Sequence, residues 1–233
     1  GAFLYVGVAV CPYDRRPVRQ YVFGRTESQV RMGRNRIMES MVQNVSIVEY
    51  IRYTIAMAKI DDIYSAADDY GLVTSTDARA LGVCDAEVVQ YAARGRLERV
   101  ARGVYRVPVW PYQEQAPYAV AVKAAGEGAY LFGESVVALL GLCPTDPRAI
   151  WVATPKRTRR DLGAGVRLVW RRHPDRVAWY EGIACQEAAD AIRDAARTLG
   201  PVRAIEAARE AERRGFVTPA ELAAIEEEVG AHA

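Results

Sequence analysis

Five arginines lie within one short part of this chain of 233 residues, where they could bind a row of phosphates. Residues 91–108 hold five arginines and one glutamate, whereas residues 59–90 hold two basic residues and seven acidic ones. Positive charge concentrated at one end of a module suits the approach of that end to a phosphate backbone. The arginines are Arg94, Arg96, Arg99, Arg102 and Arg106.

Side chains that could read bases stand directly before this cluster. A helix is predicted from Ala86 to Arg94, with Gln90, Tyr91 and Arg94 pointing outward. Glutamine can bond in bidentate fashion to adenine, and arginine to guanine. A solvated helix face would show the same periodicity, but the adjoining arginines favour DNA contact. The core side of this helix is expected to be formed by Val88, Val89 and Ala92.

Hydroxyl groups precede a second short helix, which is expected to end at Leu81-Gly82. Thr74, Ser75 and Thr76 offer oxygens for its N-cap, and Arg79 follows one turn later. Hydroxyls and backbone N–H groups at such a helix start often hold phosphate. The full predicted DNA-binding set is therefore Thr74, Ser75, Thr76, Arg79, Gln90, Tyr91, Arg94, Arg96, Arg99 and Arg102.

The elements that must position these side chains are three helices and a hairpin. Ile60 and Ile63 fall on one face of the first helix, and Asp85 is expected to cap the third. Leu97 to Val107 reads as two strands joined at Arg102-Gly103, where glycine tolerates positive φ. Helices followed by a basic hairpin predict a winged helix-turn-helix, a fold that places a helix in the DNA major groove.

The rest of the chain predicts strands followed by helices, so the fold class is α+β. Helices are expected at 118–125, 129–142, 186–199, 202–214 and 219–229, and strands at 150–154, 166–170 and 177–180. The predicted domains are an N-terminal extension at 1–57 (strand, basic segment, amphipathic helix), the winged helix at 58–109, a linker at 110–117 and an α+β domain at 118–233.

Other basic regions suggest ordinary surfaces. The run from Lys156 to Arg160 could be a second anion site, but a solvated loop between strands is favoured. In the last helices, arginines alternate with glutamates at spacings such as Glu210 to Arg213, which is typical of surface pairing on a helix.

Composition and motifs argue against several classes of protein. The four cysteines are far apart and there are two histidines, so no zinc site of usual spacing can be drawn. No phosphate-binding loop, metalloprotease or hydrolase motif is present, so we expect no enzyme, cofactor or metal. No apolar run approaches the roughly 20 residues that cross a bilayer, so a soluble, cytoplasmic protein without membrane contact is expected.

The chain resembles the AbiEi family of antitoxins from bacterial toxin–antitoxin systems, with the arginine and alanine richness of actinobacterial members. Coverage is roughly 60–229, and residues 1–57 depart from the family pattern. The resemblance is carried by Gly71–Thr74, Tyr91–Val100, Arg102–Pro108 and Gly133–Leu142.

This resemblance implies a protein of two parts. The winged helix would bind double-stranded DNA at inverted repeats upstream of its own operon and repress transcription, and a homodimer on DNA would suit such repeats. The C-terminal domain would counteract a toxin of the nucleotidyltransferase type. Three alternatives stay open: a winged helix fused to a divergent nuclease-like domain, a general transcriptional regulator, and a module that binds only proteins.

Overall fold

The computed structural model describes residues 59–157, 162–163, 165–173 and 175–231. The chain divides into two units, residues 1–52 and 53–233, and the description below concerns the second. The predicted strand, basic segment and amphipathic helix of residues 1–57 lie outside the described residues.

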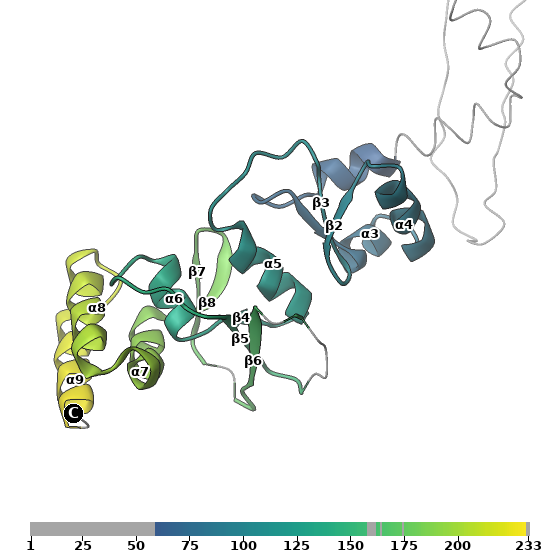
Figure 1. Ribbon diagram of the computed structural model, residues 1–233. Coiled ribbons are helices and arrows are strands. Elements are labelled where there is room, and N and C mark those ends of the chain that lie inside the picture. The colour runs from purple at the N-terminus through teal and green to yellow at the C-terminus, as the bar shows by residue number, and fades with distance from the viewer. Residues whose placement is uncertain (1–58, 158–161, 164, 174, 232–233) are drawn as a thin grey trace, which may run out of the picture. The chain divides into compact units, whose positions relative to one another are not determined.

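The first part of the described chain is a winged helix (Figure 1). A helix at 59–65 is followed by β1 (Leu72–Thr74), α3 (Ser75–Ala80) and α4 (Asp85–Ala93). The hairpin then consists of β2 (Glu98–Ala101) and β3 (Val104–Arg106). The three strands form an antiparallel sheet in the order β1-β3-β2. The predicted α+β fold with a winged helix is confirmed, and β1 is a strand that the sequence did not indicate.

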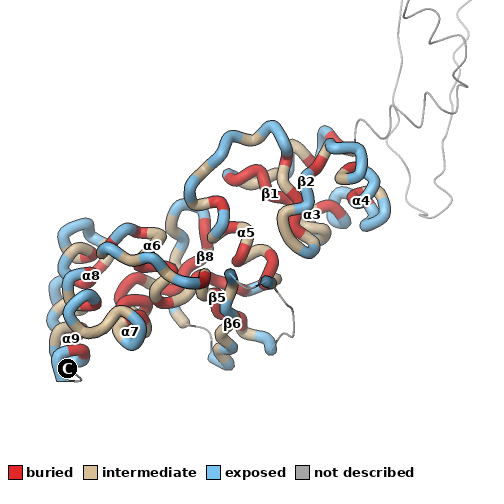
Figure 2. Tube along the Cα trace, viewed as in Figure 1, coloured by how far each residue is buried: buried red, intermediate tan, exposed pale blue. Residues whose placement is uncertain are grey.

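An apolar core holds these helices against one face of the small sheet (Figure 2). Ile60 and Ile63 from the first helix are buried, as predicted, and meet Val88 of α4. Val73 and Tyr105 pair across β1 and β3 and face the same core.

Gly71 brings the chain from the first helix into β1. Its φ of +69° lies in the left-handed region, and a Cβ atom there would lie 2.3 Å from Cγ of Trp110. The Trp110 ring therefore lies directly against this backbone, and its Nε1 donates a hydrogen bond of 3.0 Å to the carbonyl of Asp69. Only glycine meets both requirements.

The second sheet is mixed and has five strands in the order β6-β5-β4-β8-β7. Two pairs are parallel, β5 with β6 and β4 with β8, and the other two are antiparallel. Sequence periodicity indicated three of these strands and missed β4 and β8. The strands are β4 (Tyr130–Leu131), β5 (Ile150–Thr154), β6 (Val166–Trp170), β7 (Val177–Tyr180) and β8 (Ile183–Gln186).

The prediction of a single helix at 129–142 is wrong. The structure has β4 and then α6 (Glu134–Leu139), separated by Gly133 at a φ of +51°. The N–H of Phe132 donates to the carbonyl of Trp151, which ties this segment to β5. Pairing with a neighbouring strand therefore overrides the helical periodicity of the residues before Gly133.

α5 (Ala116–Ala125) and α6 contact the second sheet, and three further helices finish the chain. α5 contacts β5, β4 and β8, whereas α7 (Ala188–Leu199), α8 (Pro201–Arg213) and α9 (Pro219–Gly230) pack together (Figure 1). Alanines dominate the buried faces of α7 and α8, and such small side chains let helices approach closely. Thr218 caps α9, because its hydroxyl accepts the N–H of Glu221.

α5 also contacts β2 and β3 of the wing. Leu72 and Val104 of the small sheet are buried in the same apolar cluster as α5. Polar contacts add to this packing, since Lys123 Nζ lies 3.1 Å from a carboxylate oxygen of Asp68 and the Tyr70 hydroxyl donates to the Glu181 carbonyl at 2.5 Å. One face of the small sheet thus covers the helices of the winged helix, and the other packs against α5.

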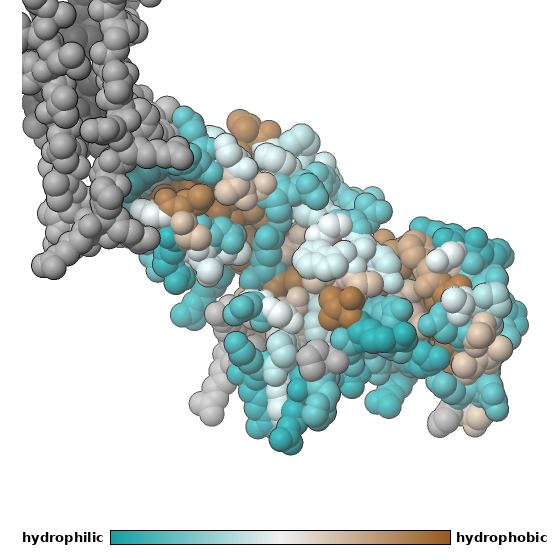
Figure 3. Space-filling model, turned by 180° about the vertical axis from the view of Figure 1, so that it is seen from behind, coloured by the Kyte–Doolittle hydropathy of each residue, from teal (hydrophilic) through white to brown (hydrophobic). Residues whose placement is uncertain are grey.

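Within the described residues, none of the helices has the length and apolar character that crossing a bilayer requires. Figure 3 shows mainly hydrophilic residues on the face that it presents, with scattered apolar patches.

Candidate nucleic-acid interface

The helix α4 presents Gln90 to solvent but not Tyr91. Tyr91 is buried, with 6% of its surface exposed, whereas Val89 is 54% exposed. The predicted outward position of Tyr91 and the predicted core position of Val89 are therefore wrong. Val88 and Tyr91 are three residues apart, so they lie on one side of the helix, and the large tyrosine ring fills the core there.

The start of α4 also differs from the prediction. Cys84, not Asp85, is the N-cap residue, and its N–H donates to Glu87 at 2.9 Å. Lys59 Nζ donates to the other Glu87 oxygen at 2.8 Å. Burial opposes ionisation of Glu87, but these hydrogen bonds outweigh it and lower the pKa of the carboxyl below its ordinary value. The pair fixes the first helix to the start of α4.

The wing presents Arg99 and Arg102 to solvent. Neither guanidinium forms an ion pair or hydrogen bond with any residue in the described part of the chain, and the same holds for the exposed Arg94. Arg106 differs, because its Nη2 lies 2.7 Å from Glu98 on the neighbouring strand. Three arginines of this cluster are therefore exposed and without an ion pair in the described part of the chain, whereas Arg106 is paired within the hairpin.

Arg96 is half-buried at the join between α4 and the wing. Its carbonyl accepts a hydrogen bond of 2.7 Å from the hydroxyl of Tyr64. This contact anchors the backbone between α4 and β2, so it helps to set the direction in which the wing leaves α4.

The first turn of α3 is tied to the tip of the wing. The Ser75 N–H donates to the carbonyl of Gly103 at 2.9 Å. The Thr74 hydroxyl caps α3, accepting the Asp77 N–H at 3.2 Å and donating to the Asp77 carboxylate at 2.8 Å. Thr76 is exposed, unlike its two half-buried neighbours. The turn therefore offers Thr76 outward, while Thr74 and Ser75 hold the local structure together.

Arg79 lies on the exposed side of α3, near the start of α4. Its Nε donates to the Ser75 carbonyl at 3.1 Å and lies 3.2 Å from Asp85. Both members of this pair are largely exposed, and such surface pairs are worth about 0–1 kcal/mol. A phosphate could therefore compete with Asp85 for the guanidinium at little cost.

Residues 63–108 match the family model described as "Transcriptional regulator, AbiEi antitoxin". This segment, which folds as a winged helix, is similar to the AbiEi antitoxin regulators. The match runs from the first helix to the residues just after β3, so it includes α3, α4 and the wing. It confirms the resemblance to AbiEi antitoxins over these residues, and it indicates a transcriptional regulator of the antitoxin type. A comparison of the chain with curated proteins found no match.

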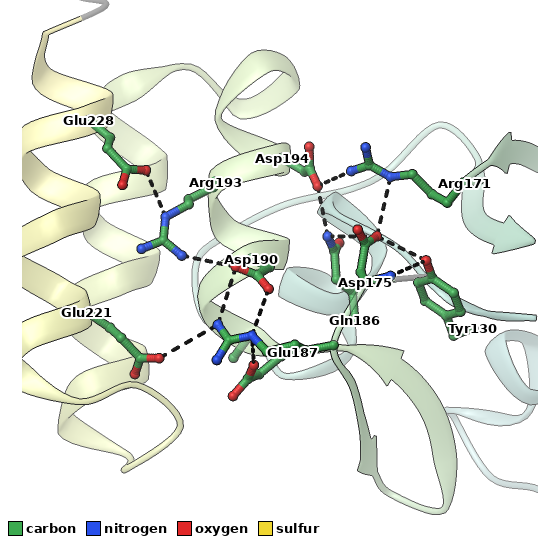
Figure 4. Close-up of polar contacts among 12 residues, drawn as sticks. Tyr130, Arg171, Asp175, Gln186, Glu187, Asp190, Arg193, Asp194, Glu221 and Glu228 are labelled. Atoms are coloured by element: carbon green, nitrogen blue, oxygen red, sulfur yellow. Dashed lines mark hydrogen bonds and ion pairs between the residues drawn. The ribbon is translucent and has the colours of Figure 1, made fainter. Parts of the chain in front are cut away.

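Beyond the AbiEi match, a buried glutamine organises a polar cluster (Figure 4). Gln186 is 1% exposed; its Oε1 accepts the Gly133 N–H at 3.0 Å and its Nε2 donates to Asp194 at 2.8 Å. Arg171 pairs with Asp194 at 2.5 Å and with Asp175 at 3.3 Å. The acids of this cluster therefore have partners within the protein, and their role is to join β8, α7 and the end of β6.

A neighbouring network joins α7 to α9. Arg193 bridges Asp190 at 3.1 Å and Glu228 at 2.8 Å (Figure 4). Arg213 pairs with Glu210 on α8, as their spacing predicted, and Arg209 pairs with Glu226 of α9. Among the described residues, no group of three or more potential ligands is placed to hold a metal ion.

The basic run at Lys156–Arg160 is described only in part. Lys156 and Arg157 are exposed, and the Arg157 guanidinium lies 4.4 Å from the centroid of the Trp170 ring. Residues 158–160 lie outside the described part of the chain.

Two features of the interface were missed from the sequence. The first is the hydrogen bonding of Thr74 with Asp77; the two residues have the spacing of a capping box, so the sequence contained a signal for it. The second is the exposure of Val89, whose signal was weak: Val88 and Val89 are identical residues, and only the spacing of three residues between Val88 and Tyr91 indicates which of them faces the core.

Proposed function

We propose that this chain is a DNA-binding autorepressor of the antitoxin type. Its winged helix would bind inverted repeats upstream of its own operon, with α4 in the major groove and the wing along the backbone. The observation that carries this proposal is the exposure of Arg99 and Arg102 without partners in the described chain, beside the exposed face of α4.

The roles follow from the chemistry of each side chain. Arg94, Arg99 and Arg102 would neutralise phosphates, and Arg96 and Arg79 would add contacts at the two ends of α4. Gln90 would pair with adenine, because its amide supplies the matching donor and acceptor. Thr76 would donate its hydroxyl to a phosphate, whereas Thr74, Ser75 and Tyr91 would support the site through the packing and hydrogen bonds described above.

The second half of the proposal concerns the toxin. We propose that residues 118–233 form an α+β antitoxin domain that counteracts a toxin of the nucleotidyltransferase type, and that the chain acts without catalysis of its own, in the cytoplasm. This half rests on the resemblance to AbiEi antitoxins. Inverted repeats would suit two copies of the chain on one operator.

A mobility shift on the DNA upstream of the chain's own gene tests the DNA-binding half. Replacing both Arg99 and Arg102 with Ala removes two phosphate contacts, which should weaken binding about thirtyfold at 0.15 M salt. Arg203→Ala is the matched control, since Arg203 is an exposed arginine on α8, and it should bind like the wild type. Equal affinity of the double variant and the control would contradict the proposal.

A further inference from the structure

The exposed face of α4 contains an apolar side chain at its centre. Val89 is 54% exposed, although valine is among the residues most often buried. Its helix neighbours Val88 and Tyr91 supply the buried side, so the fold does not use Val89 in its core.

Val89 belongs to a stripe of exposed residues. Ala86, Val89, Gln90 and Ala93 are all exposed, and their spacings of three and four place them on one helix face. The two alanines end at Cβ, so Val89 and Gln90 project furthest from the middle of the stripe. A molecule that binds to this face would therefore first contact the isopropyl group of Val89 and the amide of Gln90.

In the major groove, these two side chains have complementary targets. Adenine offers the donor and acceptor that match a glutamine amide, and the C5-methyl of thymine is the one apolar group on the base edges. Consecutive residues of an α-helix point about 100° apart, so neighbouring side chains contact different bases.

We propose that Val89 packs against the methyl group of a thymine and, with Gln90, makes α4 specific for neighbouring A·T pairs. This inference rests on the proposed function, because it needs α4 to lie in the major groove. It adds Val89 as a specificity-determining residue and names the base that Val89 reads.

A thymidine in the duplex can be replaced by deoxyuridine, which removes only the C5-methyl group of the base. The full chain is first used to enrich duplexes from a randomised library. The affinity for the enriched duplex is then measured by fluorescence anisotropy, with each thymine of the half-site replaced in turn. The proteins are the wild type, Val89→Ala and the control Val202→Ala, which changes a valine that is 70% exposed on α8.

We expect one position at which deoxyuridine weakens wild-type binding about fourfold, the value for losing one buried methyl group. Val89→Ala should bind the thymine duplex about fourfold more weakly and should not distinguish thymine from deoxyuridine at that position. Val202→Ala should behave like the wild type.

The outcomes separate this inference from the function on which it rests. If a duplex is enriched but no thymine shows a methyl effect, or if Val89→Ala keeps the full effect, the role of Val89 is wrong and the proposed function stands. If no duplex is enriched or bound, the proposed function fails and this inference fails with it.

Discussion

Gln90 and Tyr91 are neighbours on α4, yet one side chain faces solvent and the other faces the core. The aromatic ring of Tyr91 lies among the residues that hold the first helix, α4 and the wing together. A buried aromatic at this point determines how α4 is rotated, and thereby which of its residues are presented to solvent.

Replacing Tyr91 with Ala should lower the free energy of unfolding by about 3 kcal/mol, because it leaves a cavity in a small core. Gln90→Ala should leave the unfolding free energy unchanged within about 0.5 kcal/mol and should weaken DNA binding instead. Urea unfolding of both variants measures the difference. If Tyr91→Ala were as stable as Gln90→Ala, the ring would not be a core residue.

Cys185 and Cys84 should differ strongly in reactivity. Cys185 is fully buried on β8, and burial raises the pKa of its thiol to about 12, whereas Cys84 is exposed. At pH 8 roughly one Cys185 thiol in ten thousand would be ionised, and the thiolate is the species that reacts. Iodoacetamide followed by peptide mass spectrometry should therefore label Cys84 in the native protein and Cys185 only after unfolding. Rapid native labelling of Cys185 would contradict its position in the core.

At the scale of elements, the connection between α3 and the wing determines the shape of the interface. The Ser75 N–H bonded to Gly103 holds the tip of the hairpin, and Thr74 caps the helix beside it. The wing is therefore oriented by a short helix whose own start is fixed.

Thr74→Ala should destabilise the protein by about 1 kcal/mol, since it leaves the Asp77 N–H without its capping oxygen. Thr74→Ser retains the oxygen and should restore most of that stability. Thermal unfolding measures both variants. If Thr74→Ala changed DNA affinity at wild-type stability, the hydroxyl would be a phosphate ligand rather than a cap.

Elements with strong local signals could be predicted from the sequence, and those defined by distant partners could not. The basic hairpin was predicted because apolar and polar residues alternate on either side of Gly103. β1 and β4 have three and two residues, too few to show a period, and both exist because they pair with strands far along the chain. The same limit applies to the site, since the arginines of the wing were found by composition but the exposure of Val89 was not.

At the scale of the whole molecule, charge separates two kinds of surface. On α7 and α8, Arg193, Arg209 and Arg213 are paired with acids, whereas Arg94, Arg99 and Arg102 are exposed without partners in the described chain. A cation that already has a partner gains less from phosphate than a free one. The difference favours the winged helix as the part that contacts DNA.

If DNA binding and toxin neutralisation belong to different parts of the chain, they should separate in one variant. Replacing Arg99 and Arg102 with Ala should relieve repression of a reporter placed behind the upstream DNA. The same variant should still rescue the growth of cells that express the neighbouring toxin gene. Loss of both activities in a stably folded double variant would show that neutralisation requires the wing.

The salt dependence of DNA affinity tests the central claim most directly. If Arg94, Arg96, Arg99 and Arg102 neutralise phosphates, a plot of log K against log salt concentration should have a slope of about −3 to −4 per bound winged helix. Replacing Arg99 and Arg102 with Ala should bring the slope closer to zero by about 2, and Arg203→Ala should leave it unchanged. A wild-type slope near zero, or one that the double variant does not alter, would contradict the claim that these arginines bind the DNA backbone.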